Sequence, residues 1–459
     1  MLNKGAKLVG QTLSYENKII LAPMVRIGTL PSRLLALKYG VDIVYTEELV
    51  DFRIIKSIRM ENDVLKTVDF VDPTDGSVVF RTCDAEKSKL VLQMGTACPA
   101  RALKVAKMVE RDVAAIDINM GCPKEFSIKG GMGAALLSDQ ERAKNILKTL
   151  IDNVSVPVTC KVRIFPKIED TIKLVKEFEA LGIAAIAIHG RTRDERPQHP
   201  VHPDAIRAVA QELSIPVIAN GGSREINQHN DILKFRENCG ASSVMIARAA
   251  EWNPSIFRKD GMLPLDEVIT EYLRLSVDYD NSPSNTKYCV QNMLRELQET
   301  PRGRIFLDSQ TLEQICQIWD LGEYCRQKQL EYLHKGMFTR RDSGAMFPEG
   351  PDVKKIKLDP DILEKNVAFV RANYKEAHML PKSILHLYAD KNDHKLPTYE
   401  TFGEEKLFRS IITFRGHRYS SSFWEKNKKF AEQGAALVCL LDLGLVDEKA
   451  LIENGSILQ

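Results

Sequence analysis

The chain has 459 residues, which is too many for one hydrophobic core, so its length predicts two or three domains. Hydrophobic residues make up 44% and charged residues 27%, and no apolar run approaches the roughly 20 residues of a membrane-spanning helix, so we expect no membrane association. The net charge is only +2, so a nucleic-acid partner would have to be held by local basic patches.

The nine cysteines are scattered and form no close CxxC pair. This spacing predicts reduced thiols rather than a disulfide framework, and it offers no paired ligands for a metal ion. Residues 1–18 lack the apolar centre of a secretion signal, so the sequence predicts a cytoplasmic protein. No pattern indicates an oligomer, and a monomer is the default expectation.

From residue 18 to about residue 248, short apolar runs alternate with longer amphipathic stretches such as 171–181. The runs are rich in Val and Ile and apolar on both faces, which is typical of buried parallel strands. The eight runs are 19–22, 43–45, 90–93, 115–118, 156–161, 184–188, 215–219 and 243–247. They predict an α/β fold, a TIM (β/α)8 barrel. A doubly wound sheet is the competitor, but its usual glycine-rich turn after the first strand is replaced here by Ala22-Pro23-Met24-Val25-Arg26.

The pattern changes after residue 254. Residues 266–321 show only helical periodicity, and residues 336–359 have linker composition. A last folded stretch reads as a helix over 383–389, strands over 398–402, 407–414 and 417–423, and a helix over 425–443. The predicted division is a barrel domain over 18–257, a helical domain over 258–335, a linker over 336–375, an α-β-β-β-α domain over 376–445 and a tail over 446–459.

Polar or Gly/Pro-rich groups follow every predicted barrel strand. Because the active site of a TIM barrel lies at the C-terminal ends of its strands, we expect these groups to surround one mouth. In chain order they are Pro23 and Met24, Glu47 and Glu48, Gln93, Asn119, Lys161 and Arg163, His189 and Arg191, Asn220 to Gly222, and Ala247 and Arg248.

The ends of the last two strands predict an anion site. Gly221 and Gly222 allow backbone N–H groups to approach a ligand closely, and Arg248 adds a fork of donors. Lys161 would lie deeper as a lone cation, which suits a cofactor that becomes anionic, as reduced flavin does. The alternative for Lys161 is a buried ion pair with a neighbouring carboxylate. His189 alone would be read as structural, but its place in the array favours a role in the site.

Cys122 stands in a loop, Asn119-Met120-Gly121-Cys122-Pro123-Lys124, directly after the fourth strand. A cysteine in a Gly-Cys-Pro turn is often only a small turn residue. Here Lys124 and Lys129 are near in sequence, and a thiol near cations is a candidate proton donor close to neutral pH.

With these motifs the sequence resembles the dihydrouridine synthase family. The matching segments are Leu21-Ala22-Pro23-Met24, Gln93-Met94-Gly95, Asn119 to Pro123, Gly130-Gly131-Met132-Gly133-Ala134, Lys161-Val162-Arg163, His189-Gly190-Arg191 and Asn220-Gly221-Gly222. They cover roughly residues 18–272 in the expected order. The C-terminal stretch resembles a double-stranded-RNA-binding domain, and the combination resembles a eukaryotic member of the family in which a barrel, a helical domain and that domain follow in this order.

The resemblance implies a reaction and a set of residue roles. NADPH would reduce FMN, which would pass a hydride to C6 of a D-loop uridine of tRNA, expected at position 20, and Cys122 would protonate C5. Asn119, Arg163, Glu48 and Arg191 would line the uridine pocket. FMN would be held by Pro23, Met24, Val25, Gln93, Lys161, His189, Asn220, Gly221, Gly222, Ala247 and Arg248.

The RNA-binding resemblance implies phosphate contacts from a set of basic residues. The set is Lys382, Lys406, Arg409, Arg415, Arg418, Lys428 and Lys429. The pattern departs from the usual one because Glu432 stands where a third lysine is typical. Two alternatives are open for this domain: Lys428-Lys429 as a merely solvated helix start, and dimerisation.

Two other functions compete with tRNA reduction. One is an FMN-dependent barrel reductase of a small pyrimidine, which a C-terminal RNA-binding domain disfavours. The other is a non-catalytic RNA-binding protein on a retained barrel, which the full array of polar residues disfavours.

Overall fold

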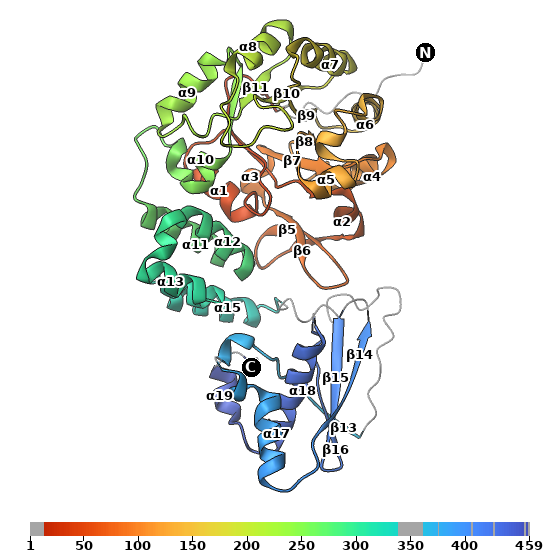
Figure 1. The fold of residues 1–459 in the computed structure, drawn as a ribbon, viewed down its shortest axis with the longest axis vertical. Helices are drawn as coiled ribbons and strands as arrows, with labels where there is room; N and C mark the ends of the chain where they lie inside the picture. Colours follow the sequence, from red (N-terminus) through yellow and green to blue (C-terminus); the bar gives the residue numbers. More distant parts are fainter. Residues whose placement is uncertain are drawn as a thin grey trace. The chain divides into compact units, whose positions relative to one another are not determined.

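The computed structural model describes residues 13–337, 361–374, 376–404, 407–425, 427–453 and 456–457. The chain forms two compact units whose main break lies between Lys335 and Gly336, and each unit is described by itself (Figure 1). None of the helices in these ranges is both long and apolar enough to cross a membrane.

The first unit is built on a closed barrel of eight parallel strands. They are β1 (Ile19–Leu21), β2 (Ile43–Tyr45), β7 (Leu90–Gly95), β8 (Ala115–Met120), β9 (Val158–Arg163), β10 (Ala185–His189), β11 (Val217–Asn220) and β12 (Ser243–Ile246). The ring closes because β12 pairs with β1 and β2 pairs with β7. The predicted TIM barrel is therefore confirmed, with a strand at each of the eight predicted runs.

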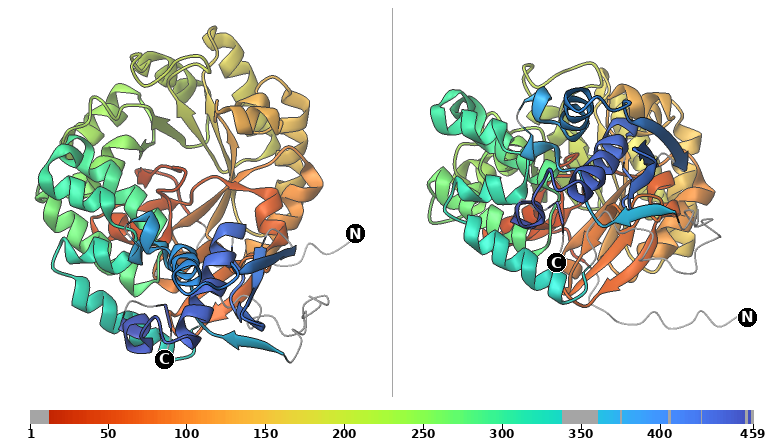
Figure 2. Two further views of the ribbon diagram at one scale, coloured as in Figure 1. Left: turned by 60° about the horizontal axis from the view of Figure 1, so that its bottom comes forward. Right: turned by 90° about the horizontal axis from the view of Figure 1, so that it is seen from below.

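Helices surround the strands (Figure 2). The longer ones are α1 (Leu30–Lys38), α4 (Pro99–Val109), α6 (Gln140–Asn153), α7 (Ile168–Leu181), α8 (Pro203–Glu212) and α9 (His229–Asn238). Shorter elements are α2 (Asp51–Lys56), α3 (Asp84–Lys87), α5 (Glu125–Lys129), η1 (Gly133–Ala135), α10 (Arg248–Trp252) and η2 (Pro254–Phe257). Their apolar faces bury a continuous core against the outer surface of the barrel.

A small antiparallel sheet, which the sequence pattern does not predict, is inserted between the second and third barrel strands. It consists of β4 (Ile58–Asn62), β5 (Thr67–Val71) and β6 (Val78–Thr82), and the two-residue strand β3 (Leu49–Val50) precedes it. Phe70 and Phe80 pack with ring centroids 5.3 Å apart. Arg59 reaches Asp112 of the barrel with an Nε–Oδ2 distance of 2.7 Å.

A buried ion pair joins this insertion to the β1–α1 turn. Arg33 on α1 and Glu86 on α3 are 2% and 0% exposed, with Nη2–Oε1 and Nε–Oε2 distances of 2.6 and 2.7 Å. The same guanidinium donates to the carbonyl oxygens of Gly28, at 2.6 Å, and Arg81, at 2.7 Å. The arginine thus fixes the end of the turn that follows the first barrel strand.

The helices after the barrel continue its hydrophobic core. They are α11 (Leu265–Asp278), α12 (Pro283–Leu294), η3 (Arg295–Glu299), α13 (Pro301–Asp308), α14 (Leu312–Gln317) and α15 (Gly322–His334), so the predicted helical region is confirmed. Buried residues of these helices belong to one cluster with the barrel core.

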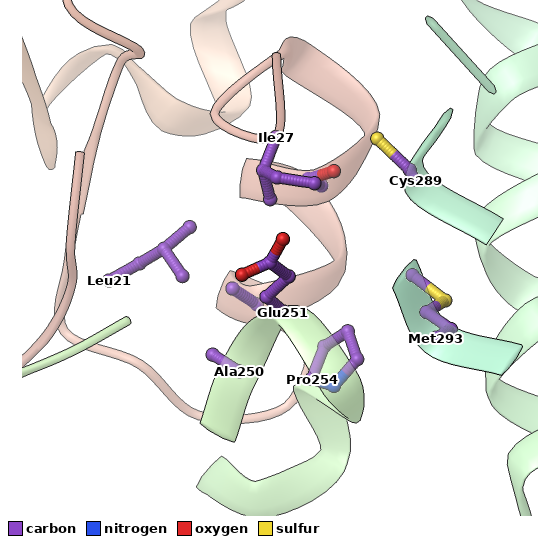
Figure 3. Close-up of a pocket in the computed structure, with 9 residues that line it drawn as sticks. Leu21, Ile27, Ala250, Glu251, Pro254, Cys289 and Met293 are labelled. Carbon is purple, nitrogen blue, oxygen red and sulfur yellow. The ribbon is translucent and has the colours of Figure 1, made fainter. Parts of the chain in front are cut away.

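A cavity about the size of one water molecule lies where α10 and α12 meet β1, and Leu21, Glu251 and Cys289 are among its lining residues (Figure 3).

The second unit has the predicted α-β-β-β-α order. Helix α17 (Pro381–Lys391) precedes an antiparallel sheet of β14 (Thr398–Glu404), β15 (Leu407–Phe414) and β16 (His417–Ser421), and α18 (Lys428–Asp442) follows. The sequence predicts that the last helix begins at residue 425. It begins at Lys428 because Asn427 caps it, its side-chain oxygen accepting from the Phe430 N–H at 2.9 Å.

Part of the predicted linker over 336–375 is folded. Strand β13 (Ile362–Lys365) pairs in parallel with β16 at the edge of the sheet. The short turns η4 (Arg371–Asn373) and η5 (Ala377–Met379) follow, and helix α19 (Glu448–Glu453) lies in the predicted tail. A four-residue strand whose middle residues are exposed gives little periodic signal, which is why the sequence did not indicate it.

Candidate active site

The predicted polar residues at the ends of β8 to β11 lie side by side. Asn119 is the register partner of Lys161 across β8 and β9, and His189 pairs with Arg163 on β9 and with Asn220 on β11. Because the strands are parallel, these ends meet at one mouth of the barrel, as expected from the sequence.

Beneath this mouth a buried carboxyl group organises the barrel interior. Asp117 on β8 is fully buried and accepts hydrogen bonds from Gln93 Nε2 at 2.9 Å and Thr159 Oγ1 at 2.7 Å. Burial raises the pKa of Asp117 to about 6 despite these donors and Lys161. The sequence reasoning missed Asp117, although a carboxylate between two isoleucines of a buried strand was a usable signal.

Lys161 is the predicted deep cation. Its side chain is half-buried, and Asp117 is the carboxylate that acts on it electrostatically. Burial, followed by repulsion from Arg163, lowers the pKa of Lys161 to about 8, while Asp117 opposes the shift. A ligand that brings negative charge to this point would be stabilised by the ammonium group.

Glycines shape the mouth at the end of β11. Gly221 has φ +121°, and a Cβ there would lie 2.9 Å from both His189 Cδ2 and Val201 Cγ2. A Cβ on Gly222 would lie 2.6 Å from the Phe235 ring. Neither position has room for a side chain, so the backbone is free to approach a ligand. Asn220 is buried and donates from Nδ2 to the Met245 carbonyl at 2.9 Å.

Several cations surround His189 and make this side of the mouth electropositive. Burial lowers the pKa of His189 well below its usual value, and Lys161, Arg163, Arg191 and Arg248 add to the shift. The imidazole is therefore neutral at pH 7, and the charge around it comes from the lysine and the arginines.

Arg191 braces the loops at the mouth. Its side chain is 3% exposed, and it donates from Nε to the His199 carbonyl at 2.9 Å and from Nη1 to the Gly221 carbonyl at 2.7 Å. Two of its three guanidinium nitrogens therefore bind backbone oxygens and support the glycine cradle, and its contact with a substrate stays a prediction.

The loop after β1 is held in a strained form. Arg26 has φ +67°, and its N–H donates to Glu47 Oε2 at 2.7 Å. Its carbonyl accepts from Asn285 Nδ2 of α12 at 2.6 Å. Residues 23–25 immediately precede Arg26, and the Val25 side chain is 37% exposed.

Ala247, also predicted for the site, is the N-cap of α10.

The Cys122 loop is fixed by four hydrogen bonds. Asn119 Oδ1 accepts from the N–H groups of Gly121 and Cys122 at 2.9 and 3.0 Å. The Cys122 carbonyl accepts from the Ala134 N–H at 3.0 Å, and Arg163 Nε donates to the Gly121 carbonyl at 2.8 Å. Asn119 and Arg163, predicted for the substrate pocket, therefore also position the thiol.

Cys122 and Cys98 are the two partly exposed cysteines, and the other seven are buried. Glu48, which follows β2, lies beside Cys122, Asn119 and Ser127, with Ser127 Oγ 3.5 Å from Oε1. Burial raises the pKa of Glu48, and the hydrogen bonds and charges of its neighbours only partly offset this rise.

Within the described ranges no group of three or more His, Cys, Asp or Glu residues could hold a metal ion.

In the second unit, three of the predicted RNA-binding residues are exposed. Lys428 and Lys429 begin α18, and Arg415 lies in the β15–β16 turn. Arg418 is partly exposed, with Nη2 4.0 Å from Glu400 Oε2. Lys406 lies outside the described residues.

Two other predicted RNA-binding residues are engaged within the domain. Arg409 is 7% exposed, and its Nη2 lies 2.6 Å from Glu364 Oε2 of β13. Its Nε donates to the Ser421 carbonyl at 2.8 Å. Lys382 forms an ion pair with Glu432, the residue at the position of the missing third lysine. Arg409 is therefore buried and paired within the sheet, and its contact with RNA stays a prediction.

Comparison with known families gives two matches. The family model described as dihydrouridine synthase (Dus) matches residues 20–307, and the double-stranded RNA binding motif matches residues 381–443.

Curated relatives match about three fifths of the chain. A tRNA-dihydrouridine(20) synthase (NAD(P)+) of Schizosaccharomyces pombe is 40% identical over 293 residues, which are 62% of this chain and 60% of that protein. The Saccharomyces cerevisiae protein of the same name is 36% identical over 300 residues, covering 61% of this chain and 78% of that protein. The chain thus spans only about 60% of the length of the S. pombe relative.

Among solved structures, one similar chain is the crystal structure of a tRNA-dihydrouridine(20) synthase dsRBD domain. It is 38% identical and covers 18% of this chain and 89% of that chain, with a TM-score of 0.17.

Proposed function

The chain belongs to the dihydrouridine synthase family, and from this premise we propose that it reduces the C5=C6 bond of a uridine in the D-loop of tRNA, with NADPH as the reductant. Relatives named for position 20 favour that uridine. The single observation that carries the proposal is the meeting of a glycine cradle, a half-buried lysine and a partly exposed thiol at one barrel mouth.

The mouth fits FMN. Gly221 and Gly222 leave a cradle that a Cβ would fill, and Arg248, which begins α10, acts electrostatically on His189 next to Gly221, so this end suits the phosphate. FMN, once reduced, supplies a hydride to C6 of the base. Lys161 would hold the negative charge of the reduced ring, and its lowered pKa would rise again when that charge is present.

Other residues would fix the position of the cofactor. Gln93 is buried, and its amide is oriented by the hydrogen bond from Nε2 to Asp117, which leaves Oε1 as an acceptor. His189 is neutral and can accept or donate one hydrogen bond. The remaining groups proposed for the FMN site are Pro23, Met24, Val25, Asn220 and Ala247.

Cys122 would supply the proton to C5. Its loop is held by Asn119 and Arg163, so the sulfur has a fixed place at the mouth. Asn119, Arg163 and Glu48 would form the wall against which the uridine lies. A base that is stacked or paired in tRNA must be turned out of its stack to reach this wall, which costs a few kcal/mol.

The second unit would supply affinity for the RNA. Lys428 and Lys429 are exposed at the start of α18, Arg415 is exposed in a turn, and Arg418 is partly exposed. Such residues contact phosphates of an RNA duplex without reading its sequence. A reductase of a free small pyrimidine would have no use for this surface.

The test is mass spectrometry of nucleosides from unmodified tRNA incubated with the protein, FMN and NADPH. Dihydrouridine should form with the wild type, and Cys122→Ala should bind FMN normally while losing most turnover. Loss of FMN binding in Cys122→Ala would show that the cysteine is not a dedicated proton donor. Free uridine reduced in place of tRNA would favour the small-pyrimidine reductase.

A further inference from the structure

A carboxylate is built into the wall next to the candidate acid Cys122. Gly95, at the end of β7, makes room for it, because a Cβ there would lie 2.6 Å from Glu48 Oε1. Ser127 Oγ is 3.5 Å from the same oxygen. The other oxygen, Oε2, is buried and makes no hydrogen bond with any described residue. Glu48 is therefore enclosed by the barrel, but its Oε2 atom takes part in no hydrogen bond that holds the described part of the fold together.

The charges around Cys122 would, without Glu48, be mainly positive. Lys161 and Arg163 on β9 both interact electrostatically with the thiol. Lys124, two residues after Cys122, acts on Glu48. Nearby cations stabilise a thiolate, yet a thiolate has no proton to give to C5 of a uridine. Glu48 is the acidic group beside the sulfur that opposes this effect.

We propose that Glu48 is a positioning residue that keeps the reactive proton on the Cys122 sulfur until the uridine is protonated. This inference rests on the proposed function. The negative carboxylate disfavours a second negative charge on sulfur, and Oε2 is available to accept a hydrogen bond from the S–H group. In each turnover the S–H bond breaks as the C5–H bond forms, and the resulting thiolate takes a proton back from water.

Glu48→Gln tests the proposal because it removes the charge and keeps the size. Alkylation of Cys122 by iodoacetamide reports the thiolate, and peptide mass spectrometry separates Cys122 from Cys98, the other partly exposed cysteine. We expect alkylation of Cys122 at pH 7 to become about ten-fold faster, with the alkylation–pH curve moving to lower pH. Alkylation of Cys98 should not change. Glu48→Asp, which keeps the charge, should stay closer to the wild type.

Turnover on tRNA should then fall first at alkaline pH in Glu48→Gln. Glu47→Gln is the matched control for alkylation, because Glu47 is the adjacent carboxylate but its Oε2 accepts from Arg26 on the β1 side. Unchanged Cys122 alkylation in Glu48→Gln, or an equal change in Glu47→Gln, would overturn the proposal. The alkylation assay needs neither tRNA nor NADPH, so its result stands apart from that of the proposed reaction.

Discussion

Replacing Arg33 by methionine should destabilise the barrel unit by about 3–5 kcal/mol, because it leaves a buried carboxylate without its counter-charge. Methionine keeps an apolar stem of similar length. Among the partners in the described part of the chain, Glu86, 0% exposed, would retain only the hydrogen bond from Thr82 Oγ1 at 2.9 Å. For a unit of about 330 residues the unfolding entropy is about 0.7 kcal/mol/K, so Tm should fall by about 4–7 °C.

The matched control is Lys38→Met on the same helix. Lys38 pairs with Glu271 at 2.9 Å, but the two side chains are 59% and 30% exposed, so the expected loss is only about 0–1 kcal/mol. Thermal unfolding followed by circular dichroism measures both variants. An Arg33→Met loss no larger than that of Lys38→Met would refute the reasoning. Arg33→Met combined with Glu86→Leu should recover part of the loss, since no unpaired charge remains.

Three further outcomes are expected. Gly221→Ala should weaken FMN binding by about ten-fold or more, because φ +121° and a Cβ 2.9 Å from His189 disfavour any side chain; flavin fluorescence titration measures this, and an unchanged Kd would contradict it. Asp117→Asn should gain stability relative to the wild type by about 2–3 kcal/mol as the pH rises from 4 to 6, measured by urea unfolding. The sign follows because burial raises the pKa of Asp117 to about 6, so the folded wild type holds a proton that the unfolded chain has lost; parallel pH curves would argue against it. Replacing Lys428 and Lys429 together by alanine should weaken tRNA binding and lower the slope of log affinity against log salt by about 2, and an unchanged slope would remove these lysines from the interface.

The barrel could be predicted because each parallel strand is a short apolar run with a polar residue at its end. The β9 run, for example, ends at Lys161 and Arg163 both in the sequence and in the structure. The mouth follows from the same pattern, since parallel strands place their carboxyl ends together. What the sequence could not give is how each polar side chain is used there. Arg191 looks like a ligand residue, and only the folded loops show that it donates to two backbone carbonyls.

Long-range pairing explains the other differences. Arg409 reads as an exposed basic residue of a strand, but the carboxylate that pairs with it, Glu364, is far away in sequence, in the predicted linker over 336–375. The sequence predicts Glu48 at the site because it follows the second strand. Its closeness to Cys122 depends on Gly95 of a third strand, which no local pattern reports.

Strand β13 determines how small a self-sufficient RNA-binding module can be. The motif itself is matched only from residue 381, whereas β13 covers the edge of β16 through residues 362–365. A fragment cut just before α17 would leave the backbone groups of β16 open to pairing with another molecule, and Arg409 would lose Glu364. Such a fragment should aggregate, whereas one that starts ahead of Ile362 keeps its border strand. The portable unit is therefore longer than its recognisable motif.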